Sequence, residues 1–266
     1  MTVSRGILRL AVVCLWFSFA AQAQEKVITW ASNPKYPPYD WSHEENHYDG
    51  AAAVLLPLII PEGYTLRPVM VPWARAQRMA QEGYIDLLVN LRITPERSAW
   101  LQFSKNPTFP NPIAVFMRKE NAVPFESWDE LKSLRGGVTI GDAFGNGFDA
   151  YLKANLKVEA IPNAYSNFRK LESGRIDYFV TGYYMGMTWL VNANKQEVIV
   201  PLKPFISNHS IHLGFSRRSP HVALLPEIDR KLAQLAADGT LARILNEQIL
   251  AAARIPAEVF NLNAGP

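Results

Sequence analysis

The stretch MAQEGYIDLLVN at residues 79–90 decides the fold, because its pattern returns in KLESGRIDYFVT at residues 170–181. Each copy reads as a helix, a glycine, one further residue, Ile-Asp, an apolar run and a polar end. The glycines suit left-handed helix C-caps. The apolar runs at residues 85–89 and 176–180 predict buried parallel strands. A helix that feeds such a strand builds a right-handed βαβ unit, so the repeat predicts two α/β lobes of similar design.

The same repeat indicates where a ligand binds. In open α/β sheets, ligands bind beyond the carboxyl ends of the strands. The candidate residues are therefore those that end the two predicted strands: Asn90, Leu91 and Arg92 in the first lobe, and Thr181, Gly182 and Tyr183 in the second. A chance repeat is the alternative, since Gly-x-Ile-Asp is common punctuation between a helix and a strand.

A helix start follows the first strand and carries an unexpected charge. Thr94 suits the N-cap, Pro95 the first helical position, and Glu96 the first turn. Arg97 is the wrong charge for a first turn, because the peptide dipoles already make that end positive. Arg97, with Arg92 just before the helix, therefore predicts an anionic ligand shared between arginine and helix terminus.

The remaining elements fit around this frame. We expect a strand at 27–31, a proline-rich loop at 33–39, an apolar helix at 51–60, an extended crossing at 114–117, a return strand at 211–216 and amphipathic helices over 224–252. The predicted division is a signal peptide at 1–23, a first lobe at 24–117, a second lobe at 118–204, and a return to the first lobe at 205–266.

The N-terminus predicts export. Arg5 and Arg9 precede an apolar run, and Ala21-Gln22-Ala23 is a small-x-small cleavage site, which together read as a secretory signal cleaved between Ala23 and Gln24. The only cysteine, Cys14, lies within it, so a mature chain has no disulfide, thiolate metal site or thiol nucleophile. That mature chain holds 25 basic and 24 acidic residues. A near-neutral charge argues against nucleic acid as a partner.

Two motifs are weighed against simpler interpretations. HEENH at residues 43–47 matches the zinc signature H-E-x-x-H, which works only on a helix; its Tyr/Trp/Gly-rich flanks favour a polar hairpin tip, so no metal is predicted. GNGFDA at 145–150 matches a loose dinucleotide fingerprint without its later acidic residue. Gly145 and Asn146 then form either an anion-holding helix N-terminus or a plain tight turn.

Aromatic residues and one more arginine complete the candidates. Tyr36, Tyr39, Trp41 and Trp73 lie near the expected edge of the cleft, where aromatic walls orient small ligands; for each of them core packing is the alternative. Arg75 either faces the cleft or solvates a helix. We find no Ser-His-Asp set and no paired carboxylates, so no catalytic group is predicted.

These residues together resemble the bacterial extracellular solute-binding proteins of family 3, which include the polar amino acid receptors of ABC importers. The resemblance covers residues 27–250. Its landmarks, in family order, are YPPY at 36–39, GYID at 83–86, TPER at 94–97 with FS at 103–104, and GRID at 174–177. It implies a two-lobed α/β fold of the type II periplasmic binding protein class, with two hinge crossovers and a ligand cleft between the lobes.

The resemblance also implies roles for residues. In amino acid receptors, the arginine that matches Arg97 grips the ligand carboxylate, residues that match Asn90, Arg92 and Tyr36 line the pocket, and the turn at 145–146 closes from the second lobe. One position departs from the family. Gly182 stands where amino acid receptors usually carry an aspartate that holds the α-ammonium, so the bond from that aspartate is lost.

The predicted function is that of a monomeric periplasmic solute-binding protein, not an enzyme and without a cofactor. It captures a small carboxylate-bearing ligand for an inner-membrane ABC permease. Arg97 is the anchor, Arg92 or Arg75 a second cation, and Tyr36 and Trp73 the wall. Two alternatives remain: a cyclohexadienyl dehydratase-like enzyme on the same fold, and an orphan receptor that serves a signalling partner.

Overall fold

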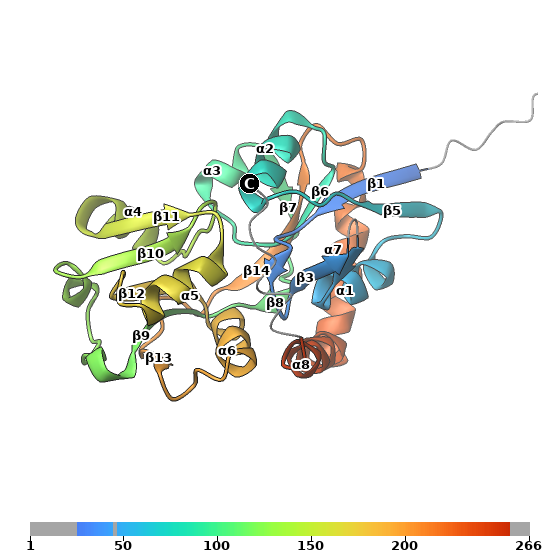
Figure 1. The fold of residues 1–266 in the computed structure, drawn as a ribbon. Helices are drawn as coiled ribbons and strands as arrows, with labels where there is room; N and C mark the ends of the chain where they lie inside the picture. The colour runs from blue at the N-terminus through green and yellow to red at the C-terminus, as the bar shows by residue number, and fades with distance from the viewer. Residues whose placement is uncertain (1–25, 45–46, 256–266) are drawn as a thin grey trace, which may run out of the picture.

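The computed structural model describes residues 26–44 and 47–255, which fold around two main β-sheets (Figure 1). The first sheet has the order β5-β1-β6-β14-β7, with β8 paired to β14 outside this path. The second has the order β11-β10-β12-β9-β13. The strands of the first are β1 (Lys26–Ala31), β5 (Tyr64–Pro68), β6 (Leu87–Leu91), β7 (Leu101–Phe103), β8 (Phe109–Pro110) and β14 (Ser210–Ser216). Those of the second are β9 (Ile113–Arg118), β10 (Arg135–Thr139), β11 (Lys157–Ile161), β12 (Tyr178–Gly182) and β13 (Ile199–Pro201).

The repeated stretch occupies the same place in both sheets. Its strands β6 and β12 lie parallel to β1 and β10 respectively, and antiparallel β14 and β9 flank them on the other side. The helices before the strands are α2 (Trp73–Glu82) and α5 (Ala164–Glu172), and Gly83 and Gly174 adopt left-handed backbone after them, with φ of +90° and +72°. The prediction of two α/β lobes of similar design is confirmed.

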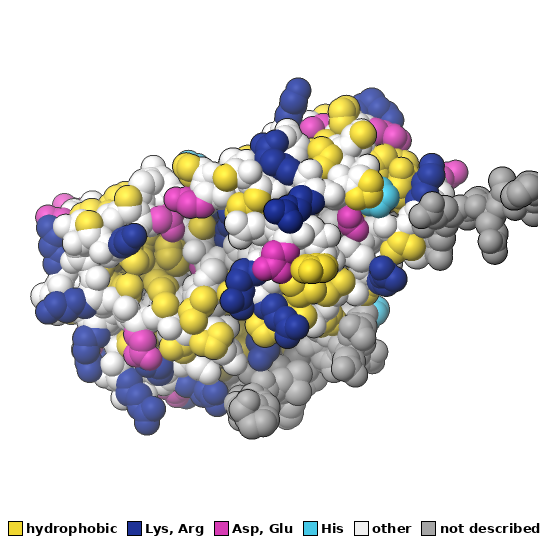
Figure 2. Space-filling view, turned by 90° about the horizontal axis from the view of Figure 1, so that it is seen from above, with side chains coloured by type: hydrophobic (Ala, Val, Ile, Leu, Met, Phe, Trp, Pro, Cys, Tyr) yellow, Lys and Arg dark blue, Asp and Glu magenta, His cyan; other side chains and the backbone are white. Residues whose placement is uncertain are grey.

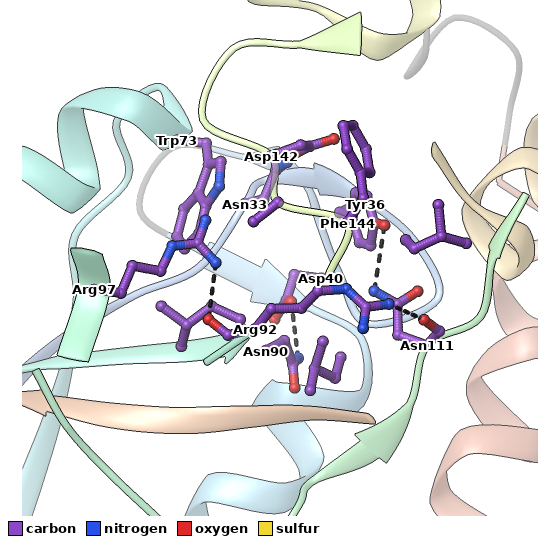
Figure 3. Close-up of a pocket in the computed structure, with 14 residues that line it drawn as sticks. Asn33, Tyr36, Asp40, Trp73, Asn90, Arg92, Arg97, Asn111, Asp142 and Phe144 are labelled. Atoms are coloured by element: carbon purple, nitrogen blue, oxygen red, sulfur yellow. Dashed lines mark hydrogen bonds between the residues drawn. The ribbon is translucent and has the colours of Figure 1, made fainter. Parts of the chain in front are cut away.

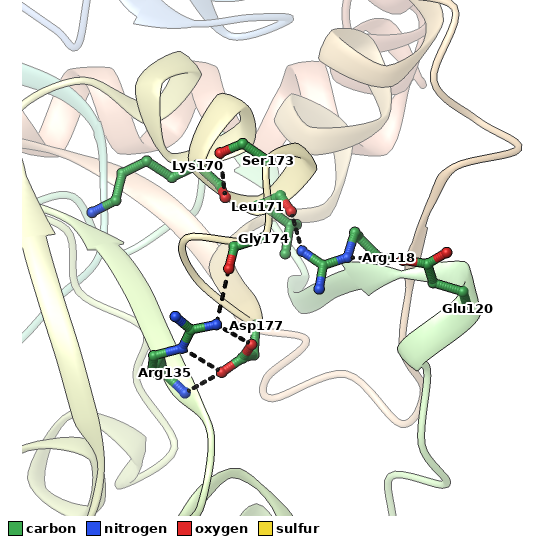
Figure 4. A network of polar contacts seen from close by, with 8 residues as sticks. All are labelled: Arg118, Glu120, Arg135, Lys170, Leu171, Ser173, Gly174 and Asp177. Atoms are coloured by element: carbon green, nitrogen blue, oxygen red, sulfur yellow. Dashed lines mark hydrogen bonds and ion pairs between the residues drawn. The ribbon is translucent and has the colours of Figure 1, made fainter.

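Both repeat strands begin two residues later than predicted, because the aspartate of each Ile-Asp pair binds the neighbouring strand. The Asp86 carboxylate accepts from Thr29 N at 2.9 Å and from Thr29 Oγ1 at 2.6 Å. The Asp177 carboxylate accepts from Arg135 N, Nε and Nη2 at 2.8 to 3.0 Å (Figure 4). These aspartates anchor β6 to β1 and β12 to β10, which gives the motif a structural role.

Helices cover the sheets. In the first lobe these are α1 (Ala51–Ile59), α2, the short α3 (Pro95–Ser98), α7 (Leu225–Ala237) and α8 (Thr240–Ala252), and in the second α4 (Phe148–Asn155), α5 and α6 (Tyr183–Asn192). Single 3-10 turns lie at Lys119–Asn121, Trp128–Leu131 and Val222–Leu224. The apolar α1 buries Leu55, Leu56 and Ile59 and packs against α7 and α8. This agrees with the predicted apolar helix at 51–60 and the amphipathic helices over 224–252.

Two chain segments cross between the sheets, from β8 to β9 and from β13 to β14. Residues 114–117 are extended as predicted, but they lie within β9, which pairs with β12 and β13. The second sheet therefore already includes residues that the predicted boundary at 117/118 assigned to the first lobe. Ser210–Ser216 returns to the first sheet as predicted.

The described residues of the zinc-like motif at 43–47 belong to a small third sheet and not to a helix. This sheet joins β2 (Lys35–Tyr36), β3 (Asp40–Glu44) and β4 (His47–Asp49), with Glu44 paired to His47. The two histidines of H-E-x-x-H thus lie on paired strands, as the hairpin interpretation predicted, while residues 45–46 lie outside the described residues. The predicted signal peptide also lies outside them.

The surface agrees with a nearly balanced charge. On the face that Figure 2 shows, Lys and Arg side chains are interspersed with Asp and Glu side chains. Within residues 26–44 and 47–255, no helix combines the length and the apolar character that crossing a membrane demands.

Candidate functional site

A cavity lies between the lobes, at the carboxyl ends of β6 and β10 (Figure 3). The first lobe contributes most of its polar lining: Asn33, Tyr36, Asp40, Asn90, Arg92 and Arg97. The second lobe contributes the loop after β10, with Asp142, Ala143 and Phe144. The cavity volume is about 30 Å³, far below the roughly 150 Å³ of a cavity that accommodates benzene. In this conformation the lobes are therefore closed too tightly for an amino acid.

Arg97 projects into this cavity from the helix start that the sequence predicted. The Thr94 hydroxyl accepts from Arg97 N at 3.2 Å, and Pro95 opens α3. The buried guanidinium donates from Nε to Gln77 Oε1 at 3.1 Å and from Nη1 to the Arg92 carbonyl at 3.0 Å. Burial lowers the pKa of Arg97 to about 10, against the opposing pull of Asp142. Arg97 therefore stays charged at neutral pH.

The third contact of Arg97 reaches across the cleft. Its Nη2 donates to the carbonyl of Gly141 in the second lobe at 2.8 Å. The same carbonyl accepts from Trp73 Nε1 at 3.1 Å and from Gln77 Nε2 at 3.0 Å. Three donors of the first lobe thus converge on one backbone oxygen and hold the lobes together. Opening the cleft must break all three bonds.

Arg92 connects the cavity with both crossings. Its Nη2 donates to the Asn111 carbonyl in the first crossing, and its Nη1 to the His209 carbonyl in the second at 3.2 Å. Arg92 is 4% exposed, and its Nε is buried without a partner. Burial lowers its pKa, while Tyr36, Tyr39, Asp149 and Asp142 act in the opposite direction. Arg92 is thus a buried cation at the point where the lobes are joined.

Two carboxyl groups also line the cavity. Asp40 Oδ2 accepts from Ser32 Oγ at 2.5 Å and from Asn90 Nδ2 at 2.9 Å, whereas Oδ1 is buried without a partner. Burial raises the pKa of Asp40 to about 7, against the hydrogen bonds from Ser32 and Asn90. Burial likewise raises the pKa of Asp142 to about 7, although Arg97 and Arg92 favour its charged form. The cavity thus holds two cations and two acids that titrate near neutral pH.

Tyr36 closes the second-lobe side of the cavity. A side chain at Gly182 would overlap its hydroxyl and would lie 2.7 Å from Asn111 Oδ1. Burial raises the pKa of Tyr36 to about 12. The departure at Gly182 therefore has a steric cause, because Tyr36 occupies the space that an aspartate side chain would need.

The structure brings half of the predicted site residues together. Arg97, Asn90, Arg92, Tyr36 and Trp73 line the cavity. The others lie elsewhere: Arg75 and Asn146 are exposed, Thr181 is buried beside Met185, Tyr183 packs on Tyr184 and Phe205, and Gly145 lines a second hollow.

The second hollow lies on the other side of Arg92 and has a volume of about 490 Å³. Gly145, His209 and His212 are among its lining residues. The second lobe therefore contributes the loop 141–144 to the main cavity, and not the turn 145–146 that was predicted to close it.

Sequence reasoning missed several cavity residues. Asn33 and Asp40 flank the YPPY landmark, and Asn111 lies between two prolines of the first crossing. Asp142 is the third residue after the end of β10, so the rule of strand carboxyl ends points to it once β10 is placed. Asp40 carries no such signal, since only the pairing of β2 with β3 turns it towards the cavity. Across the described parts of the chain, no group of three or more His, Cys, Asp or Glu side chains is arranged to hold a metal ion.

Fold and site together define a two-lobed binding protein with a charged cavity between the lobes. Residues 28–250 match the family model of the bacterial extracellular solute-binding proteins, family 3, and the chain belongs to this family. A relative is the ABC transporter arginine-binding protein 1 of Escherichia coli (strain K12). It is 24% identical over 248 residues, which are 90% of this chain and 96% of the relative.

Solved structures agree on the fold. The amino acid ABC transporter substrate-binding protein AbpA from Streptococcus pneumoniae, bound to L-arginine, matches with a TM-score of 0.74 at 18% identity over 88% of this chain and 99% of its own. The ancestral amino acid-binding protein AncCDT-1, described as a precursor of cyclohexadienyl dehydratase, matches with a TM-score of 0.68 at 20% identity over 84% and 95%. The fold is that of the type II periplasmic binding proteins.

Proposed function

We propose that this protein captures a small carboxylate-bearing ligand, an amino acid or a related organic acid, in the periplasm and delivers it to an inner-membrane ABC permease. Membership of the solute-binding family supports the general role. The relatives whose names state amino acid or arginine binding support the ligand class. The chain acts as a monomer, with the two lobes as the moving parts.

The buried Arg97 is the observation that carries the proposal. A guanidinium has five N–H donors, of which three bind Gln77, Arg92 and Gly141. The bond to Gly141 is the one that opening of the lobes releases. An arginine with free N–H groups in a water-poor cleft binds a carboxylate through two parallel hydrogen bonds. Arg92 lies beside it as the second cation.

Ligand entry requires hinge opening, because a cavity of about 30 Å³ is too small for an amino acid. Separation of the lobes breaks the three bonds to the Gly141 carbonyl. A ligand carboxylate on Arg97 then replaces that carbonyl as the acceptor. Closure of the second lobe over the ligand excludes water and creates the shape that a permease recognises.

The test is ligand binding by the mature chain and two arginine variants. A thermal-shift screen with amino acids, dicarboxylates and aromatic acids selects ligands, and calorimetry gives their affinities. Arg97→Ala should weaken binding by about 100-fold or more, because two charge-assisted hydrogen bonds are lost. Arg78→Ala is the matched control, since Arg78 is an exposed arginine on α2. Unchanged affinity in Arg97→Ala, with its fold verified by circular dichroism, would contradict the proposal.

A second candidate function rests on the two acids of the cavity. A carboxylic acid with a pKa of about 7 in a closed site is suited to proton transfer, and Asp40 and Asp142 both have this property. A dehydratase needs such an acid, and AncCDT-1 links the fold to a dehydratase lineage. Incubation with prephenate or arogenate, followed by detection of phenylpyruvate or phenylalanine, distinguishes the enzyme from the binding protein.

A further inference from the structure

The second-lobe position where amino acid receptors of the family usually carry the ammonium-binding aspartate is closed by Tyr36, because no side chain fits at Gly182. Any cation on the ligand must therefore find its partner elsewhere. We propose that Asp40 of the first lobe is this partner, so that the ligand is a carboxylate that also carries a cationic nitrogen. This inference rests on the proposed function and adds the ligand's second charge.

The geometry of Asp40 supports the assignment. Its side chain lines the cavity from the start of β3 and the residue is 1% exposed. Ser32 Oγ and Asn90 Nδ2 hold Oδ2 and so fix the direction of the carboxylate. Figure 3 shows the bond from Asn90. Oδ1 has no partner. A buried carboxylate oxygen without a partner is costly, and an N–H donor of a ligand removes that cost.

The other acid of the cavity is a weaker candidate. Asp142 lies in the field of Arg97 and Arg92, which favour its charged form. Asp40 is held only by the neutral hydroxyl of Ser32 and the neutral amide of Asn90. A ligand cation beside Asp142 would be repelled by Arg97 and Arg92. A ligand cation beside Asp40 would instead neutralise a carboxylate whose hydrogen-bond donors are both uncharged. Charge complementarity therefore favours Asp40.

Two further atoms match a ligand with charges of both signs. Asn111 Oδ1 and Arg92 Nε belong to cavity residues and, like Asp40 Oδ1, are buried without partners. The two oxygens accept hydrogen bonds and the nitrogen donates one. A ligand with N–H donors and a carboxylate satisfies all three atoms. Because Arg97, Arg92 and Asp40 all lie on the first-lobe side of the crossings, both charges of the ligand bind there before the second lobe closes.

The test compares matched ligand pairs by calorimetry on the wild-type mature chain. L-Glutamate is compared with glutarate, which lacks the α-amine. L-Arginine is compared with 5-guanidinopentanoate, which lacks the α-amine, and with L-citrulline, which lacks the side-chain charge. We expect the ligand with the relevant cation to bind about 10- to 100-fold more tightly, as a charge-assisted hydrogen bond would produce. The arginine series shows whether Asp40 binds the α-ammonium or the guanidinium.

The variant Asp40→Asn then assigns the effect to this residue. Asparagine keeps an oxygen that accepts from Ser32 and Asn90, and thermal unfolding verifies the fold. The variant should lose most of the difference within each pair, whereas Asp142→Asn should change both members alike. Equal affinities within every wild-type pair, or an undiminished difference in a folded Asp40→Asn, would overturn this inference alone. Absence of binding by both ligand classes would overturn the proposed function as well.

Discussion

The two lobes share one design and differ in what they present to the cavity. By the register of the repeat, Asn90, Leu91 and Arg92 correspond to Thr181, Gly182 and Tyr183. Each residue of the first set lines the cavity, and no residue of the second set does. A repeat that is accurate for topology is therefore no guide to which strand end carries the chemistry.

The difference has a local cause. After β6 the chain stays irregular for Arg92, Ile93 and Thr94 before α3, which leaves room for side chains to turn into the cavity. After β12 it enters α6 at once, and Tyr183 N donates to the Pro112 carbonyl at 2.8 Å. Tyr36 of the first lobe covers the end of β12. In the second lobe the residues that line the cavity come instead from the loop after β10.

The largest effect should come from forcing the family's aspartate into the second lobe. Gly182→Asp should lower the free energy of unfolding by about 3 kcal/mol or more, because it combines overpacking against Tyr36 with a buried carboxylate. Gly182→Ala should cost about 1–3 kcal/mol from overpacking alone. Urea denaturation measures both. The φ of Gly182 is −61°, so backbone strain contributes nothing.

Tyr36 gives the control for this prediction. In a Tyr36→Phe background the hydroxyl oxygen is gone, so the cost of Gly182→Ala should be smaller than in the wild-type chain. A double-mutant cycle measures that coupling. Equal costs in the two backgrounds would show that Tyr36 is not what excludes a side chain from this strand end.

A smaller effect should follow from blocking the contact at Gly141. A methyl group there would lie 2.8 Å from Gln77 Nε2 and 3.2 Å from Trp73 Cδ1. Gly141→Ala should therefore hinder closure and weaken ligand binding by about 10-fold, equivalent to about 1.4 kcal/mol. Small-angle scattering with ligand present should give a larger radius of gyration than for the wild type.

Gly63→Ala is the matched control, since Gly63 has a similar φ of +83° against +89° but no atom near the added methyl group. It shares the backbone strain and leaves closure unchanged. If both variants bound ligand with wild-type affinity, the packing of Gly141 against Gln77 and Trp73 would have no part in closure over the ligand.

The smallest expected effect is the difference in stability cost between the two aspartates of the repeat. Asp86 accepts from the backbone and hydroxyl of Thr29 and from Ser219 Oγ at 2.8 Å. Asp177 pairs with Arg135, whose side chain is 60% exposed. Asp86→Ala should cost about 2 kcal/mol, because it leaves partly buried donors unpaired. Asp177→Ala should cost about 1 kcal/mol at most, as for exposed ion pairs. Chemical denaturation giving the opposite order would contradict this assignment of roles.

Much of the fold follows from local signals in the chain. The Thr94-Pro95 helix start, the glycine C-caps at Gly83 and Gly174, and the apolar strands of the repeat all depend on neighbouring residues. Such signals depend on backbone dihedrals, capping groups and side-chain period, so they can be recognised from the sequence without the tertiary structure. The boundary at 117/118 was less accurate, because membership of β9 in the second sheet depends on pairing with distant β12 and β13.

The sequence by itself determined the two-lobed α/β design, the family and the two arginines of the cavity, since these follow from periodicity, caps and motif order. Only the tertiary structure decided which other groups face that cavity. Asp40, Asn111 and the pair Gly141–Asp142 come from three separate segments, and Tyr36 excludes a side chain at Gly182 from more than a hundred residues away. Sequence spacing carries no information about such encounters, because they depend on how the two lobes close against each other.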